Sequence, residues 1–246
     1  MPVASWFLTR PSRARTQLRL YCFSYAGGSA AVFAPWHDLI DPGIEICAVQ
    51  LPGRADRIAE PLCLSIAQAV EAIAQETQRP DGLPYAFFGH SLGGLLAFEV
   101  ARFCARHYFT LPKHLIVSGC GAPQLRSASR SLHELPDSQF IDLLHQYDGT
   151  PREILQNEEL MGLLLPAIRA DFGMVANYEY RHSPRLKVPI TVLAGLQDSH
   201  VSPAQAEGWC RETESGCHLE WLEGGHFFIH SQREEIIRSV NRILAG

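Results

Sequence analysis

The stretch that decides the fold is residues 85–102, YAFFGHSLGGLLAFEVAR. It opens with four apolar and aromatic residues, as a short buried strand does, and turns through Gly-His-Ser-Leu-Gly at residues 89–93. The apolar residues after the turn recur at helical spacing. Strand, G-x-S-x-G and helix in this order predict a nucleophile elbow, which exposes the oxygen of Ser91 above a sheet and beside a helix N-terminus. The alternative is a plain glycine-rich loop.

Outward from this stretch, short apolar runs predict further strands at residues 18–23, 44–50, 114–119, 188–194 and 217–222. Helical patterns cover residues 31–40, 65–78 and 231–244. Strands that alternate with helices at this spacing indicate an α/β fold with a mostly parallel sheet covered on both faces. Residues 1–17 are a basic, proline-containing lead-in with no predicted element.

The alternation breaks between residues 133 and 180, where no strand pattern is found. Residues 136–147 and 158–178 predict helices, and the second is apolar on more than one face. A helical insertion between sheet strands is where α/β enzymes carry a lid. We therefore expect one domain over residues 1–246, with 133–180 as its lid; the alternative is an ordinary helix pair that covers the sheet.

Composition excludes several classes of protein. The formal net charge is -5 without a basic patch, which argues against a nucleic-acid partner. No apolar run is long enough to span a membrane, and the N-terminal residues lack a secretion signal. The seven cysteines are scattered and form no C-x-x-C pair, which predicts reduced core thiols rather than disulfides or a zinc site. We expect a cytoplasmic protein, monomeric by default.

A serine nucleophile needs a base, and the base needs an orienting carboxylate. In this architecture the two follow the serine in the order acid, then histidine, each after a strand. Asp198 follows the strand at 188–194, and His226 follows the strand at 217–222 behind a Gly-Gly pair. The sequence therefore predicts a triad of Ser91, Asp198 and His226.

Four other residues compete for these roles less well. His90 is next to the nucleophile, where consecutive side chains point apart, so we expect it to orient or pack. His200 precedes the last strand, and His230 lies at the start of the final helix region. Asp171 falls in the insertion, where we expect it to support the lid.

The developing oxyanion needs backbone donors. One should be the N–H of Leu92, which follows the nucleophile, and the other should come from the loop Tyr-Ala-Gly-Gly at residues 25–28, with Ala26 as the best candidate. The alternative is a glycine-rich turn needed only for folding. The histidines lack metal-ligand spacing, and no phosphate-loop or dinucleotide pattern is present, so we expect no metal and no cofactor.

These stretches together resemble one family, the bacterial type II (external, editing) thioesterases of nonribosomal peptide and polyketide assembly lines, which are related to the animal medium-chain thioesterase of fatty acid synthase. The resemblance covers nearly the whole chain. One departure is Ser24, where the family usually has proline. The matching segments are CFSYAGGSAAVFAPW (22–36), QLPGRADRIAEP (50–61), FFGHSLGGLLAFEVAR (87–102), SGCGAP (118–123), HELPDSQFIDLLHQYDGTP (133–151), LLPAIRADFGMVANYEY (164–180), LAGLQDSHVS (193–202) and LEGGHFFI (222–229).

The resemblance implies an α/β-hydrolase fold with a helical lid, the triad Ser91, Asp198 and His226, and oxyanion donors at Ala26 and Leu92. It implies a substrate held as a thioester on the phosphopantetheine arm of a carrier protein, in antibiotic or siderophore biosynthesis. Carrier proteins are acidic, so Arg54 and Arg57 are candidate docking residues, the alternative being plain surface charges. Competing functions are a medium-chain fatty acyl-carrier thioesterase, a general carboxylesterase and a non-catalytic scaffold.

Overall fold

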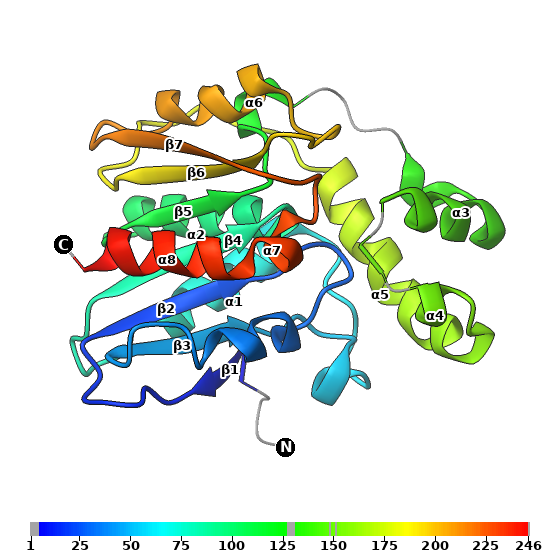
Figure 1. The fold of residues 1–246 in the computed structure, drawn as a ribbon, viewed down its shortest axis with the longest axis horizontal. Coiled ribbons are helices and arrows are strands. Elements are labelled where there is room, and N and C mark those ends of the chain that lie inside the picture. Colours follow the sequence, from blue (N-terminus) through cyan, green and yellow to red (C-terminus); the bar gives the residue numbers. More distant parts are fainter. Residues whose placement is uncertain (1–4, 127–130, 148, 151, 246) are drawn as a thin grey trace.

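A seven-stranded sheet forms the centre of the molecule (Figure 1). The computed structural model describes residues 5–126, 131–147, 149–150 and 152–245. The strand order is β1-β3-β2-β4-β5-β6-β7, and every neighbouring pair is parallel except β1 and β3. This confirms the predicted α/β class. The strands are β1 (Phe7–Arg10), β2 (Leu18–Phe23), β3 (Ile44–Val49), β4 (Tyr85–His90), β5 (Leu115–Ser118), β6 (Ile190–Gly195) and β7 (Cys217–Leu222).

Helices cover both faces of the sheet. Alternate residues of the central strand β4 point to opposite faces, so each face presents apolar side chains that helices can cover. Phe87 packs in one apolar cluster with residues of α1 (Ile66–Thr77) and α2 (Leu92–Arg106). Its neighbour Phe88 packs in a second cluster with η1 (Ala30–Trp36) and α8 (Arg233–Leu244). Figure 1 shows α8 in front of the sheet and α1 and α2 behind it.

The segment between β5 and β6 carries α3 (Asp137–Tyr147), α4 (Arg152–Leu155) and α5 (Glu158–Ala176), which lie beyond one end of the sheet (Figure 1). Their apolar side chains form a cluster of their own, centred on Phe140 and Leu165. The described part of this segment contains no strand, in agreement with the sequence pattern. The remaining short helices are η2 (Ala55–Arg57), η3 (Pro123–Leu125), η4 (Leu132–Glu134), α6 (Pro203–Glu207), η5 (Gly208–Arg211) and α7 (Phe228–Ser231).

Two expectations about these elements are wrong, whereas the helix predicted at residues 231–244 is present as α8, with the short helix α7 before it. The lead-in contains a strand, since β1 pairs antiparallel with β3 and its Phe7 ring lies 4.7 Å from Tyr21. Cys210 and Cys217 form a disulfide between η5 and the start of β7. The other five cysteines are buried free thiols, as expected.

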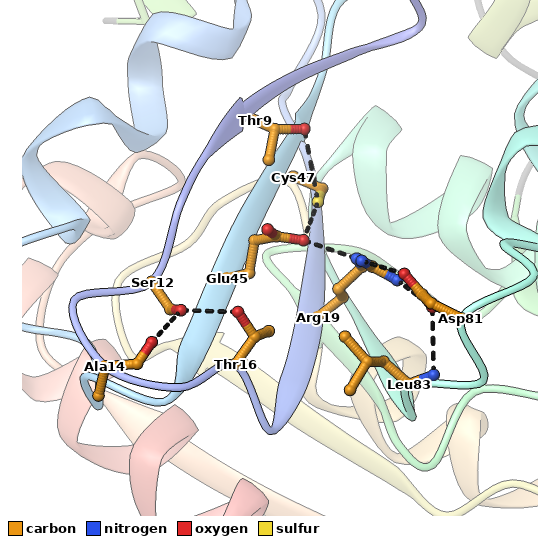
Figure 2. A network of polar contacts seen from close by, with 9 residues as sticks. All are labelled: Thr9, Ser12, Ala14, Thr16, Arg19, Glu45, Cys47, Asp81 and Leu83. Atoms are coloured by element: carbon orange, nitrogen blue, oxygen red, sulfur yellow. Dashed lines mark hydrogen bonds and ion pairs between the residues drawn. The ribbon is translucent and has the colours of Figure 1, made fainter.

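An ion-pair network ties the amino-terminal ends of the strands together (Figure 2). Arg19 of β2 donates to Glu45 of β3 at 2.6 Å and to both carboxylate oxygens of Asp81 at 2.8 and 2.6 Å. The Arg19 side chain is buried, and the Glu45 side chain is only 14% exposed, so water can replace little of what Arg19 gives its carboxylate. The network therefore fixes the register of β2 against β3 and against the segment that leads into β4.

We expect Arg19→Met to lower the free energy of unfolding by about 2 kcal/mol, because it leaves the partly buried Glu45 carboxylate without its cation. Urea unfolding measures the change. The matched control is Arg238→Met, whose ion pair with Glu235 is on the surface and should contribute less than about 0.5 kcal/mol. Equal effects for the two variants would contradict a structural role for the Arg19 network.

Candidate active site

The nucleophile elbow has the geometry that the sequence predicts. Strand β4 ends at His90, α2 begins at Leu92, and Ser91 between them has φ 54° and ψ -117°. This is a strained conformation for a residue with a side chain, and functional sites often contain one. A Cβ on Gly93 would lie 2.1 Å from the carbonyl oxygen of Phe23, and one on Gly89 would lie 2.2 Å from that of Gly93. Only glycine allows this approach of strand and helix.

Ser91, His226 and Asp198 form a hydrogen-bonded chain. Asp198 follows β6, and His226 follows β7. His226 Nδ1 lies 2.8 Å from Asp198 Oδ2, and His226 Nε2 lies 3.0 Å from Ser91 Oγ. Because a carboxylate can only accept, Nδ1 carries the proton and Nε2 is left to accept from the Ser91 hydroxyl. The structure thus brings the three predicted residues together in the order that general-base activation of a serine requires.

The environment keeps Asp198 ionised. Its side chain is fully buried, and burial alone would raise its pKa. The hydrogen bond and charge of His226 and the backbone N–H of His200 outweigh burial, so the pKa of Asp198 lies below its ordinary value. Asp198 Oδ1 accepts from the N–H groups of His200 and Val201 at 2.7 and 3.2 Å, which leaves Oδ2 for His226.

His90 supports the loop that carries His226. Its Nε2 lies 2.9 Å from the carbonyl oxygen of His226, and its Nδ1 lies 2.9 Å from Ser118 Oγ. The carbonyl can only accept, so Nε2 carries the proton and Nδ1 accepts from Ser118. Full burial holds the pKa of His90 well below its usual value, which keeps the ring neutral. The expectation that His90 orients or packs agrees with these contacts. The sequence does not indicate that Ser118 is its hydrogen-bond partner.

A cavity of about 610 Å³ opens above the triad. Ser91, His226, Ala26 and Leu92 line it from the sheet side, so both predicted oxyanion residues border the space that a substrate would fill. Leu92 is the first residue of α2, where backbone N–H groups and the helix dipole favour negative charge. The helical insertion supplies the opposite wall, which includes Leu143, Leu144, Tyr147, Phe172 and Val175.

The competing histidines have other roles. The ring of His200 stacks on Tyr147 of α3 with centroids 4.3 Å apart, and lies edge-on to His226 at 5.1 Å. Burial and the charge of His226 lower the pKa of His200. His230 Nε2 lies 2.9 Å from the hydroxyl oxygen of Tyr25. Neither ring takes the place of the His226 imidazole beside Ser91.

The predicted docking role of Arg54 and Arg57 is wrong, as is their reading as plain surface charges. The two residues are only 5% and 3% exposed. Arg54 forms a bidentate ion pair with Asp171, and Arg57 pairs with Glu60 and donates to the carbonyl oxygen of Gln50. The sequence shows two arginines near a turn, but the buried partner of Arg54, Asp171, is brought to it only by tertiary structure.

Two kinds of feature are absent from the residues that the structure describes. No group of three or more His, Cys, Asp or Glu side chains there is arranged to hold a metal ion. None of the helices in the same ranges combines the length and apolar character needed to cross a membrane.

Comparison with known proteins identifies the family. The thioesterase domain model matches residues 18–244. The gramicidin S biosynthesis protein GrsT of Aneurinibacillus migulanus is 39% identical over 96% of this chain and 92% of its own. The solved structure of the type II thioesterase BorB of the borrelidin cluster has a TM-score of 0.88 at 34% identity, with 96% of each chain covered. The type II thioesterase YbtT of the yersiniabactin pathway has a TM-score of 0.87 at 30% identity, with 97% of each chain covered. This chain belongs to the thioesterase domain family and is a serine hydrolase with the α/β-hydrolase fold.

Proposed function

We propose that this protein hydrolyses acyl thioesters from the phosphopantetheine arm of carrier proteins, and so removes aberrant or stalled acyl groups from a nonribosomal peptide or polyketide assembly line. The observation that carries the proposal is the Ser91–His226–Asp198 chain under a cavity walled by the helical insertion. The relatives GrsT, BorB and YbtT support it, since they are named for such pathways. The yersiniabactin pathway of YbtT makes siderophore biosynthesis one setting for this activity. The gramicidin S pathway of GrsT and the borrelidin cluster of BorB suggest other settings.

In the acylation step, Ser91 Oγ attacks the thioester carbonyl carbon while His226 Nε2 takes the hydroxyl proton. The carbonyl π electrons move onto oxygen, where the N–H groups of Leu92 and Ala26 stabilise the negative charge. The carbon–sulfur bond then breaks, and the His226 cation returns the proton to the pantetheine sulfur. Asp198 holds His226 in the tautomer that allows both transfers.

In the deacylation step, water replaces the thiol. His226 Nε2 takes a proton from the water, whose oxygen attacks the carbonyl carbon of the acyl-Ser91 ester. The same backbone donors stabilise the second oxyanion. The bond from carbon to Ser91 Oγ breaks, and the proton returns from His226 to that oxygen. The free acid leaves, and the enzyme regains its starting state.

The insertion would act as a lid over a single α/β-hydrolase domain that extends over residues 1–246. Tyr147 and Phe172 lie on the wall opposite the triad, so residues 133–180 would shape the acyl pocket and control access. A monomer in the cytoplasm, where carrier proteins are loaded, is the form in which we expect the enzyme to act.

Carrier dependence distinguishes this function from its competitors. An octanoyl group would be offered at equal concentration on a phosphopantetheinylated peptidyl carrier protein, on a fatty acid synthase carrier and as p-nitrophenyl octanoate. We expect kcat/KM to be at least about tenfold higher for the peptidyl carrier. Equal rates on the free ester would favour a general carboxylesterase, and a preference for the fatty acid synthase carrier would favour a medium-chain fatty acyl thioesterase.

A further inference from the structure

Asp171 is a buried carboxylate outside the triad that joins three parts of the chain. It lies on α5 of the insertion, and its side chain is fully buried. Its Oδ2 accepts from Arg54 Nη1 at 2.6 Å and from the backbone N–H of Gly27 at 2.7 Å, while its Oδ1 accepts from Arg54 Nη2 at 2.7 Å. A charge buried this deeply is stable only with such partners. One side chain of the insertion therefore binds both the loop after β3 and the loop after β2.

The Gly27 contact selects the conformation of the turn at residues 25–28, here called the oxyanion turn because Ala26 lies in it. The N–H of Gly28 donates to the carbonyl oxygen of Tyr25 at 2.9 Å, and Gly27 at the third position of this turn has φ 79°. These are the features of a type II turn, in which the peptide between Ala26 and Gly27 is rotated relative to a type I turn. Rotation of that peptide to the other orientation would turn a carbonyl oxygen toward the Asp171 carboxylate. Asp171 therefore favours the observed orientation by accepting the N–H.

Two further contacts hold the same turn. A Cβ added to Gly27 would lie 3.0 Å from Ile168 Cγ1, so α5 also packs directly on the turn. Arg54 Nη1 donates to the carbonyl oxygen of Gly28 at 3.0 Å, in addition to its bonds with Asp171. The turn is thus held on one side by an apolar contact and on the other by a buried ion pair.

We propose that Asp171 is a positioning residue for the oxyanion hole. The oxyanion hole takes its working geometry only when α5 is docked on the oxyanion turn. By fixing Gly27, Asp171 fixes the adjacent peptide, whose Ala26 N–H is the donor in the mechanism above; the inference rests on that proposed function. Phe172 and Val175 of the same helix line the acyl cavity. An acyl group that fits against α5 therefore favours the docked state. The length and shape of the acyl group should then affect kcat as well as KM.

The test replaces the ion pair by apolar residues in the double variant Asp171→Leu with Arg54→Met, because such an exchange can preserve stability while it removes the acceptor for Gly27. We expect kcat on octanoyl-carrier to fall about 30-fold, within a range of about 10- to 100-fold, while KM stays within about threefold. The affinity for an octyl trifluoromethyl ketone, which adds to Ser91 and places an oxyanion in the hole, should fall by the same factor as kcat.

The control is Tyr178→Phe. The Tyr178 hydroxyl donates to Glu99 of α2 at 2.6 Å, so this variant removes another tether of the same segment without touching the oxyanion turn. We expect its kcat and ketone affinity to match those of the parent. A double variant that unfolds at the parent's temperature and keeps the parent's kcat and ketone affinity would overturn the inference. A rise in KM alone would overturn it too, since α5 would then only bind substrate.

If the double variant does not fold, Asp171→Asn tests the same point with the shape preserved. The single amide oxygen would face Gly27 but accepts more weakly than a carboxylate, and the amide nitrogen would face the Arg54 Nη2 donor. The turn is then held less firmly, so kcat and ketone affinity should fall together by about three- to tenfold. Parent values for both would overturn the inference. Failure of the proposed function is a separate result, because it would appear in the parent enzyme as an absence of thioester hydrolysis.

Discussion

Replacement of Ser91 by alanine should lower kcat for acyl-carrier hydrolysis by roughly 10⁶-fold, with KM for the carrier nearly unchanged. The variant removes the atom that attacks the carbonyl, while the cavity walls and the backbone donors stay in place. The variant should fold, because alanine at this position meets the same positive φ as serine and loses only one hydrogen bond to His226. Release of the free acid measures the rate, and loss of labelling by a fluorophosphonate probe reports the nucleophile.

The control for this variant is Ser12→Ala, which removes a serine hydroxyl from the turn between β1 and β2 at the far end of the sheet (Figure 2). It should keep the parent's rate and labelling. If Ser91→Ala retained more than about one hundredth of the parent's kcat, another group would be the nucleophile. Unchanged hydrolysis would favour the scaffold role, with the observed activity due to a contaminant.

Asp198→Asn should lower kcat by about 10⁴-fold. The backbone N–H groups of His200 and Val201 both point at Oδ1, so the amide oxygen of the variant would take that position. Its amide nitrogen would then face His226 Nδ1 as a donor. His226 would have to carry its proton on Nε2, where it could no longer accept from Ser91.

Steady-state kinetics on acyl-carrier measure the change in rate. The nitrogen-15 chemical shifts of His226 report its tautomer. Asp38→Asn, an exposed aspartate near the end of η1, is the matched control and should change neither. A variant that lost activity while Nδ1 of His226 kept its proton would show that Asp198 acts by its charge alone.

The sequence predicts the sheet well because its strands are apolar runs where both faces are buried, as in β4, or alternate between apolar and polar residues, as in β7 at the edge. Residues 18–23 and 217–222 are predicted with the bounds that the structure has. The positions of Ser91, Asp198 and His226 follow from the same fact, since parallel strands bring their carboxyl ends to one edge. Their catalytic roles stay predictions that the variants above would test.

What the sequence does not predict depends on how separate elements meet in three dimensions. Strand β1 has four residues and exists through its pairing with β3. The Cys210–Cys217 disulfide needs the close approach of η5 and β7, with the two Cα atoms 5.2 Å apart. The burial of Arg54 is set by Asp171, which lies 117 residues away. No local pattern reports such contacts, because charge and spacing look the same for a surface arginine and a buried one.

The division of Phe87 and Phe88 between the two apolar clusters has a consequence for how this protein can change in evolution. Adding or deleting one residue in β4 would exchange the faces of every side chain beyond that point and turn Ser91 away from His226. Substitutions along β4 can be absorbed by repacking, but changes of length cannot. Insertions and deletions are therefore expected in exposed connections between elements, while the spacing from Tyr85 to Gly93 stays constant.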